Sequence, residues 1–383
     1  MKRERKKKTE NTVDMAFKGI LCPDAKQENL IARTLGCCRF IYNYALAERI
    51  SVYESTGKSI SYYDQCKTLT LMKKNPEFSW LREVDSTAEQ YSLRSLQDAF
   101  DNFFRGLKEG YKTGYPKFKS KHDTRQSYHT MNNNDSIAIV DSRHIRLPKL
   151  GIVRCRIPRL PRGRIIHATI TGTPDFKYEI SIFSEEPKKC TTEYTGKAVG
   201  IDLGIKNIAI TSDDEKFDNP KSLLKNTKKL IRAQRKLLRK QSGSSNCAKQ
   251  RIKLAKIHKK IRNQRIDAIH KMTISIVRRY DIICIEDLDV KSMMKNKRIA
   301  KYLSDVSLGE VRRQLTYKAE WYGKTLITVD RWYPSTQTCS ECGYVNTKTK
   351  NIGVRYWKCP VCGQEHDRDI NAAKNILMQG MIT

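Results

Sequence analysis

Two stretches in the second half of the chain have the apolar pattern of buried β-strands that end in acidic residues. In GKAVGIDLGIKNIAITS (196–212) an alternating strand reaches Asp202, Gly204 permits a tight turn, and a second strand follows. In YDIICIEDLDV (280–290) a continuous apolar run ends at Glu286, as in a strand buried on both faces. A carboxylate inside or directly after such a strand is costly unless it is paired or binds a metal. We therefore interpret both residues as candidate metal ligands; for Asp202 the alternative is a turn-capping role.

Other segments have helical or short-strand patterns. Residues 221–280 predict a basic helical hairpin, because leucines recur every seven residues before QSGSSN (241–246) interrupts the run. The pattern from residue 23 to about 112 is helical and rich in tyrosine, which can pack in a core or stack on bases. Residues 135–190 alternate between short apolar runs and turn residues, which predicts the strands of a small barrel or sheet.

The composition fits a folded protein of two or three domains, with 383 residues of which 39% are hydrophobic. No apolar run reaches the roughly 18 residues needed to cross a bilayer. The N-terminal MKRERKKKTE is basic but is not followed by an apolar segment, so it is not interpreted as a signal peptide. We expect a basic arm here and a protein that stays in the cytoplasm.

The charge balance indicates a polyanionic partner. Lys and Arg number 74 against 41 Asp and Glu, which gives a formal net charge of +33, and the excess is spread along the chain. Solvated charged faces alone are a poor explanation for an imbalance of this size, and nucleic acid is the usual partner of so basic a protein.

Four of the 12 cysteines form two C-x2-C pairs separated by 16 residues. This spacing is typical of a structural four-cysteine Zn²⁺ site, in which no position stays open for catalysis. The glycine after each pair, Gly343 and Gly363, permits the tight turn that aims both sulfurs at one centre. A redox role for one pair is the alternative. The predicted zinc ligands are Cys339, Cys342, Cys359 and Cys362.

A third candidate carboxylate lies in HDRDINAAKNI (366–376), where we predict a helix that begins near Asp367–Asp369 and runs to about Met378. Asp369 shares a helical face with small residues that let the helix approach a sheet. Asp367 lies nearer the rim, where it can cap the helix, and it is the second choice as ligand.

Three carboxylates from separate segments of a basic chain indicate two-metal phosphodiester hydrolysis. Oxygen ligands select Mg²⁺ or Mn²⁺, and two such ions can activate a water molecule and stabilise the leaving oxygen. The predicted catalytic and metal-binding residues are therefore Asp202, Glu286 and Asp369. Asp287 is expected to point to the opposite face of its strand, and Asp289 to start the following turn.

The order of these motifs resembles the TnpB family, the transposon-encoded relatives of type V CRISPR effector nucleases. The resemblance is carried by GIDLGIKN, IEDL, PSTQTCSECG, CPVCG and DRDINAAKNI, and it extends from about Gly196 to the end of the chain. It implies an RNase H-like RuvC core with the same three acidic residues, and a zinc ribbon inserted before the last catalytic helix. It also implies a guide RNA of the omega type and cleavage of double-stranded DNA beside a short flanking motif.

The expected fold class is an α/β multi-domain protein with a RuvC core, an inserted zinc ribbon and a small N-terminal β-barrel that carries a helical recognition insertion. The predicted boundaries are 1–22 for the arm and first barrel strand, 23–118 for the helical lobe, 119–192 for the barrel, 193–330 for the RuvC core with its hairpin, 331–365 for the zinc ribbon and 366–383 for the last RuvC segment.

The expected function is that of an RNA-guided DNA endonuclease, acting as a monomer in a prokaryotic, nucleoid-associated setting. Its cofactors would be two Mg²⁺ or Mn²⁺ ions, one structural Zn²⁺ and the guide RNA. The alternatives are an RNA-guided repressor that does not cleave, a transposase acting on element ends, and a nuclease that needs no guide. The complete set of three carboxylates argues against the repressor.

Overall fold

The computed structural model describes residues 11–123, 125–175, 177–188, 194–351 and 353–382. The predicted basic arm at 1–10 lies outside the described residues. The chain divides into two compact units, Met1–Pro187 and Lys188–Thr383, and each is described by itself.

The first unit contains a seven-stranded antiparallel sheet with the order β2-β6-β7-β1-β5-β4-β3. Strand β1 is central because it pairs with β7 along Thr12–Leu21 and with β5 at Ile20–Cys22. Among the described strands, β2 and β3 are the two ends of the hydrogen-bonded order, so this order does not close the sheet into the predicted barrel. The strands are β1 Thr12–Cys22, β2 Gln126–Met131, β3 Ala138–Asp141, β4 His144–Leu147, β5 Gly151–Arg156, β6 Arg164–Gly172 and β7 Tyr178–Pro187.

The helices of the first unit are inserted between β1 and β2 and have their own apolar core. Asp24 begins the first helix with a capping box, since its side chain accepts from the Gln27 amide and the Gln27 side chain accepts from the Asp24 amide. Leu46, Leu81 and Leu96 are fully buried between the helices. The elements are α1 Ala25–Thr56, α2 Tyr62–Met72, η1 Pro76–Glu83 and α3 Ser86–Lys108.

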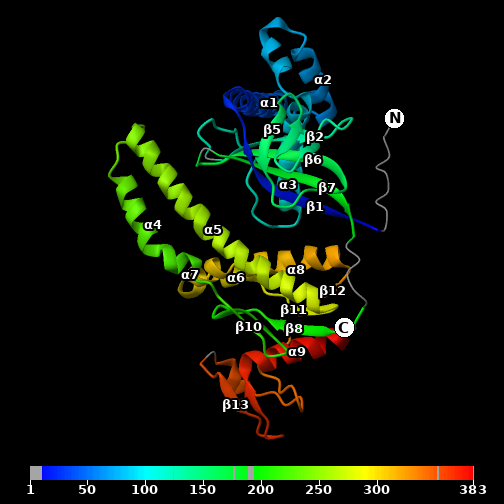
Figure 1. The fold of residues 1–383 in the computed structure, drawn as a ribbon, viewed down its shortest axis with the longest axis vertical. Helices are drawn as coiled ribbons and strands as arrows, with labels where there is room; N and C mark the ends of the chain where they lie inside the picture. Colours follow the sequence, from blue (N-terminus) through cyan, green and yellow to red (C-terminus); the bar gives the residue numbers. More distant parts are fainter. Residues whose placement is uncertain (1–10, 124, 176, 189–193, 352, 383) are drawn as a thin grey trace. The chain divides into compact units, whose positions relative to one another are not determined.

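The second unit is built on a five-stranded mixed sheet with the order β10-β9-β8-β11-β12 (Figure 1). Strands β8, β11 and β12 are parallel, whereas β9 and β10 continue from β8 as an antiparallel meander. Their apolar runs are buried on both faces, as expected for parallel strands. The strands are β8 Ala198–Asp202, β9 Asn207–Thr211, β10 Lys216–Asp218, β11 Ile282–Glu286 and β12 Thr325–Val329.

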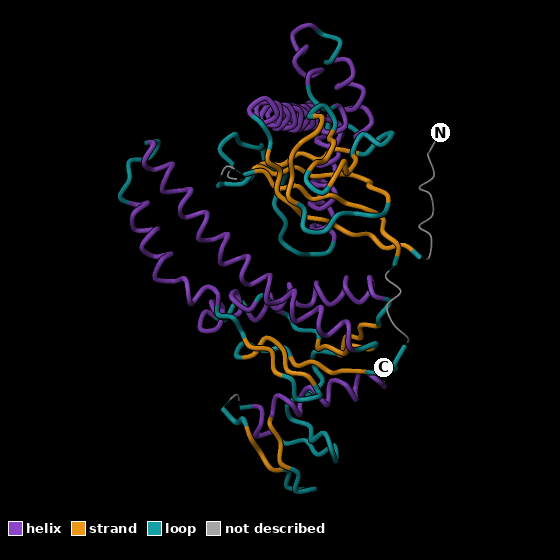
Figure 2. Tube along the Cα trace, viewed as in Figure 1, coloured by secondary structure: helices purple, strands orange, loops and turns teal. Residues whose placement is uncertain are grey.

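Helices cover both faces of this sheet, and Figure 2 shows its strands lying between them. Helices α5, α7 and α8 pack on one face through residues such as Ile276, Leu303 and Leu315, while Ile376 of α9 packs on the other face against Cys284. The helices are α4 Ser222–Leu238, α5 Ser245–Arg279, α6 Val290–Met293, α7 Lys297–Val306, α8 Leu308–Tyr322 and α9 Arg368–Ile382.

The basic hairpin consists of α4 and α5, with the break between them at the position that the sequence indicates. The N-terminus of α4 is capped from a distant segment, because both carboxylate oxygens of Asp305 accept from the Leu223 amide, at 2.9 and 3.1 Å. Helix α9 continues to Ile382, four residues beyond the predicted end at Met378, because its last turns still pack on the sheet through Gly380.

The segment between β12 and α9 contains little regular secondary structure. It contains η2 Thr347–Lys350 and a two-stranded ribbon of β13 Tyr356–Lys358 and β14 Glu365–Asp367. Its buried apolar cluster is limited to Cys339, Trp357 and Cys359, with Val354 packed against them. Within the described parts of the chain, no helix has both the length and the apolar character required to span a membrane.

Candidate active site and metal centre

Asp202 and Glu286 lie next to each other at one edge of the second unit's sheet. Asp202 is the last residue of β8 and Glu286 is the last residue of β11. The parallel register pairs Ile201 with Ile285, so the two acidic residues are the next neighbours along the strands. Both side chains are partly buried. The carboxyl ends of parallel strands meet at the same edge, which is where open α/β sheets carry their sites.

Asp369 belongs to helix α9, which approaches β8 closely. A Cβ atom at Gly200 of β8 would lie 2.6 Å from the Leu377 nitrogen and would also overlap with the carbonyl oxygen of Ala373, so only glycine fits there. Ala372 and Ala373 are fully buried, and they let the helix backbone lie directly on the strand. Asp369 stands in the first turn of this helix.

The charges of Glu286 and Asp369 both act on Asp202. Burial raises the pKa of Asp202 to about 7, and the negative charges of Asp369 and Glu286 add to the rise, while Arg368 and Arg355 oppose it. Burial also raises the pKa of Glu286. A buried cluster of carboxylates disfavours the fully ionised state unless cations balance it. Oxygen ligands that hold excess negative charge fit Mg²⁺ or Mn²⁺.

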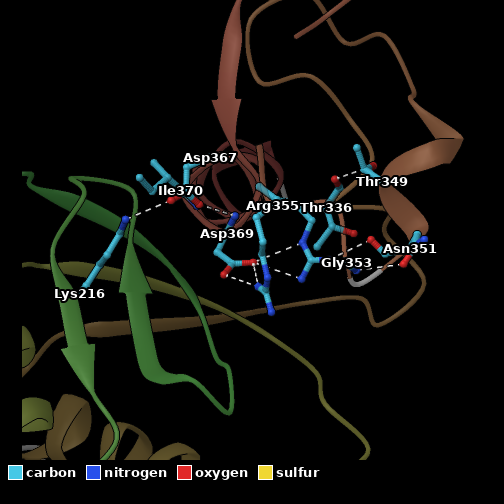
Figure 3. A network of polar contacts seen from close by, with 10 residues as sticks. Lys216, Thr336, Thr349, Asn351, Gly353, Arg355, Asp367, Asp369 and Ile370 are labelled. Carbon is cyan, nitrogen blue, oxygen red and sulfur yellow. Dashed lines mark hydrogen bonds and ion pairs between the residues drawn. The ribbon is translucent and has the colours of Figure 1, made fainter. Parts of the chain in front are cut away.

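Asp369 is held by two arginines, which the sequence pattern did not predict. The Arg355 Nη1 atom lies 3.1 and 2.9 Å from the two carboxylate oxygens of Asp369. Arg368 adds its Nε and Nη2 atoms at 3.3 and 3.2 Å from Oδ1. Figure 3 shows the Asp369 carboxylate pointing at the Arg355 guanidinium, which comes from the loop before β13. Arg368 is visible in the motif as a neighbour of Asp369, whereas nothing in the sequence marks Arg355.

Asp367, the second choice as ligand, is occupied elsewhere. Its Oδ1 atom accepts from the Asp369 amide at 3.0 Å and caps α9, and its Oδ2 atom lies 3.0 Å from the Lys216 ammonium group of β10 (Figure 3). Asp367 therefore begins the helix that carries Asp369 and ties it to the edge of the sheet.

The other acidic residues after β11 also have structural partners. Asp287 forms ion pairs with Arg312 of α8 and with Arg331, which follows β12. The Asp289 side chain accepts from the Ser292 amide at 3.0 Å and so starts α6. Of the three acidic residues in this motif, Glu286 is the one whose negative charge helps to raise the pKa of Asp202.

The four clustered cysteines form a centre with the dimensions of a zinc site. Their sulfur atoms all lie within 4.8 Å of one another, and among the described residues this is the group that meets the spacing for a metal. Cys339 and Cys362 are 3.7 Å apart, and Cys342 and Cys359 are 3.6 Å apart, between their sulfur atoms. A tetrahedron with Zn–S bonds of about 2.3 Å has edges of about 3.8 Å, so the four residues fit this ion.

The backbone of each C-x2-C turn supports the same interpretation. Gly343 and Gly363 have φ values of +77° and +76°, and their amides donate to the carbonyl groups of Cys339 and Cys359 at 2.9 and 3.0 Å. Both glycines therefore occupy the left-handed conformation that the tight turns require.

The fold as a whole is similar to that of a solved Cas12f1 chain. A cryo-EM structure of the Cas12f1–sgRNA–target DNA complex contains a chain that superposes with a TM-score of 0.56 at 14% identity, over 96% of this chain and 99% of that chain. The likeness defines the class of the protein, an α/β multi-domain protein with the Cas12f-like fold.

Sequence comparisons place the chain within this class. A Streptomyces pristinaespiralis protein is 36% identical over 377 residues, which are 96% of this chain and 90% of that protein. InsQ of Escherichia coli is 33% identical over 387 residues, which are 95% and 92% of the two chains. Both are provisionally named RNA-guided DNA endonucleases. The chain therefore belongs to the TnpB family that its motifs resemble.

Three family profiles match successive parts of the chain. "Probable transposase" (OrfB_IS605) matches residues 181–297, "Cas12f1-like, TNB domain" matches 309–376, and "Helix-turn-helix domain" (HTH_OrfB_IS605) matches 13–58. The last of these segments forms β1 and the single long helix α1 here.

Proposed function

We propose that this protein is an RNA-guided DNA endonuclease that cuts double-stranded DNA at a RuvC site with two divalent metal ions. The observation that supports the proposal is that Asp202 and Glu286 end adjacent parallel strands, while Asp369 lies in the first turn of the helix that packs on β8. The charges of Glu286 and Asp369 both raise the pKa of Asp202. Relatives that match nearly the whole chain are provisionally named for the same activity.

The strand order supports a RuvC, RNase H-like assignment for the second unit. In chain order the sheet reads 3-2-1-4-5, with an antiparallel meander followed by two parallel strands. Two of the three carboxylates end its adjacent parallel strands, and the third comes from the helix that packs across them.

The acidic residues of the site fit the binding of metal ions and the loss of a proton that accompanies it. Asp202, Glu286 and Asp369 would hold the metal ions, which supply activation of water and stabilisation of the leaving oxygen when bound. Asp202 would lose its proton on metal binding, because its pKa lies near 7. Arg355 and Arg368 neutralise Asp369 and would share its carboxylate oxygens with a cation.

The basic surface supports nucleic-acid partners. The net charge of +33 and the lysines and arginines along α4 and α5 suit phosphate backbones. We propose that the helical segment 23–118 and the strands of 119–192 read the flanking motif and hold the guide RNA–target DNA heteroduplex by its backbone. Segments 193–330 and 366–383 would form the nuclease core, and 331–365 the zinc ribbon.

Cleavage of a plasmid by the purified protein with its co-purified RNA tests the proposal. We expect Mg²⁺-dependent cuts at the sequence that matches the guide. Asp202→Ala, Glu286→Ala and Asp369→Ala should each lower the rate by at least about 1,000-fold, equivalent to about 4 kcal/mol of transition-state stabilisation. RNA binding should stay within about twofold of wild type. Glu320→Gln is the matched control, because Glu320 is exposed on α8 of the same unit.

The same assay separates the alternatives. Target binding without cuts by the wild-type protein would indicate a repressor, and joined products from element ends would indicate a transposase. Cleavage that survives removal of the RNA would indicate a nuclease without a guide. Full activity in the Asp202→Ala variant would contradict the assignment of the site.

A further inference from the structure

Helix α9 has two buried faces with different partners. Ala372, Ala373 and Ile376 are 0% exposed and pack on the sheet. Asn371 and Asn375, one helical turn apart, are 1% and 0% exposed and contact the zinc ribbon instead. Asp369 stands at the N-terminal end of the same helix. Buried amide groups are costly without hydrogen bonds, and both NH2 groups and the Asn371 oxygen find theirs in the ribbon, so the ribbon is part of the environment that the helix requires.

The two asparagines bind the chain on both sides of the first zinc ligand. The Asn371 Oδ1 atom accepts from the Ser340 amide at 2.9 Å, and its Nδ2 atom donates to the Thr338 carbonyl group at 2.7 Å. Asn375 donates to the carbonyl groups of Thr338 and Ser335, at 2.6 and 2.7 Å. Cys339 lies between Thr338 and Ser340, so its position and that of α9 are fixed by the same bonds.

His366 forms a third link between the cysteines and the helix. Its Nε2 atom lies 3.1 Å from the Cys339 sulfur, as in an N–H···S hydrogen bond to a metal-bound thiolate. Its ring packs against that of Trp357, its partner across β13 and β14, with 4.6 Å between the ring centroids and 36° between the ring planes. The next residue is Asp367, which caps α9.

We propose that Asn371, Asn375 and His366 are positioning residues that couple the zinc site to the nuclease site. Through these residues, the position of Asp369 depends on an intact first C-x2-C turn. Zinc in the ribbon therefore favours the arrangement in which Asp369 can bind a divalent ion beside Asp202. This inference rests on the proposed function, because it takes Asp369 as a ligand of the nuclease site.

The coupling must act in both directions. If zinc in the ribbon strengthens binding of Mg²⁺ at the three carboxylates, then Mg²⁺ must raise the affinity for zinc by the same factor. We expect this gain in affinity to appear as slower release of zinc. The zinc site can therefore be followed without measuring cleavage, and a role limited to folding the ribbon would not produce this effect.

The test is the rate of zinc release from the full-length protein, measured with the chromogenic chelator 4-(2-pyridylazo)resorcinol with and without saturating Mg²⁺. We expect Mg²⁺ to slow release by about 5- to 20-fold in the wild type, within the usual range of coupling between sites. Asn371→Ala and Asn375→Ala should release zinc about 10-fold faster, as for other residues that support metal ligands. In both variants, Mg²⁺ should change the rate by less than twofold.

Three further variants separate coupling from general damage. His366→Phe keeps the ring on Trp357 but removes the nitrogen, and should weaken the coupling in a folded ribbon. Asp369→Asn should abolish the effect of Mg²⁺ without faster release. Asn346→Ala is the matched control, because the Asn346 side chain accepts from the Lys348 amide at 3.1 Å, within the ribbon itself. This variant should retain the full effect of Mg²⁺.

Two results would overturn the inference: zinc release from the wild type that does not respond to Mg²⁺, or a full Mg²⁺ effect in both asparagine variants. Mn²⁺ binding measured by electron paramagnetic resonance distinguishes this failure from failure of the proposed function. Mn²⁺ binding that requires Asp202, together with Mg²⁺-independent zinc release, would reject the coupling alone. Mn²⁺ binding that is unchanged in the Asp202→Ala variant would reject the nuclease site itself.

Discussion

Replacing Asp202 with asparagine should stabilise the protein in the absence of Mg²⁺, although it should abolish cleavage. Burial and the charges of Asp369 and Glu286 raise the pKa of Asp202 from 3.8 to about 7. The folded state therefore holds this proton more tightly than the unfolded state. As pH rises from about 4 to 7, the unfolded chain ionises first, and folding becomes progressively less favourable. Above pH 7 the full cost of the buried charge is present, and an uncharged amide removes it.

The magnitude follows from the size of the shift. A rise of about three pKa units corresponds to about 4 kcal/mol at 1.36 kcal/mol per unit, and this is an upper limit because Asp202 keeps part of its surface in water. We expect Asp202→Asn to be more stable than wild type by about 2–4 kcal/mol at pH 8.5. The advantage should shrink by up to about 1.4 kcal/mol for each pH unit below 7.

The assay is urea unfolding of the zinc-loaded protein at pH 5.0 and pH 8.5 without added Mg²⁺, followed by tryptophan fluorescence. Three of the four tryptophans, Trp321, Trp332 and Trp357, lie in the second unit, so the signal reports mainly on the part that contains Asp202. Saturating Mg²⁺ should reverse the order of stability, because it binds the folded wild type in preference to the variant. A stability difference that does not change with pH, or a variant less stable than wild type at pH 8.5, would refute the reasoning.

Two further predictions concern the supports of the site. Cys359→Ser should reduce bound zinc from one ion per chain to none and expose residues 335–365 to proteolysis. The control Cys22→Ser should leave the zinc content unchanged. If elemental analysis finds one zinc ion per chain in Cys359→Ser, the ribbon is rejected. In urea unfolding, Gly200→Ala should lower the free energy of unfolding by more than about 2 kcal/mol, because the added Cβ atom overlaps the backbone of α9. The control Gly309→Ala should be neutral or slightly stabilising, because its added Cβ atom meets nothing within 4 Å. Equal stability of the two variants would show that α9 does not lie against β8.

The positions of Glu286 and of the clustered cysteines could be predicted, because in each case a short stretch of sequence contains the pattern that indicates them. An apolar run that ends at Glu286 predicts a strand end, and the structure places Glu286 there. The two C-x2-C pairs predict four sulfurs around one point, which the structure shows within 4.8 Å. The order of motifs also indicated the TnpB family, and the comparisons confirm that prediction.

Most partners of these residues could not be predicted, because they come from segments outside the motifs. Arg355 reaches Asp369 from a loop with no regular structure, and Lys216 reaches Asp367 across 151 positions. Asp305 caps α4 from 82 positions away. In so basic a chain, no sequence pattern distinguishes an arginine or lysine that contacts the site from one that is solvated. Only the packing of the segments determines which of them becomes a partner.

The contacts of α9 show why the proposed zinc ribbon suits its position between β12 and this helix. The connection from β12 to α9 runs from Asp330 to Asp367, and its apolar cluster is small. Without a metal, so short a segment cannot order itself by burying apolar surface. An ordered ribbon offers the carbonyl and amide groups of residues 335–340 to Asn371 and Asn375, on the side of the helix turned away from the sheet. Small residues bring the other side onto β8 through Gly200. A carboxylate in the first turn of a helix held on both sides has little freedom to move, and this is the condition that a metal site of defined geometry requires.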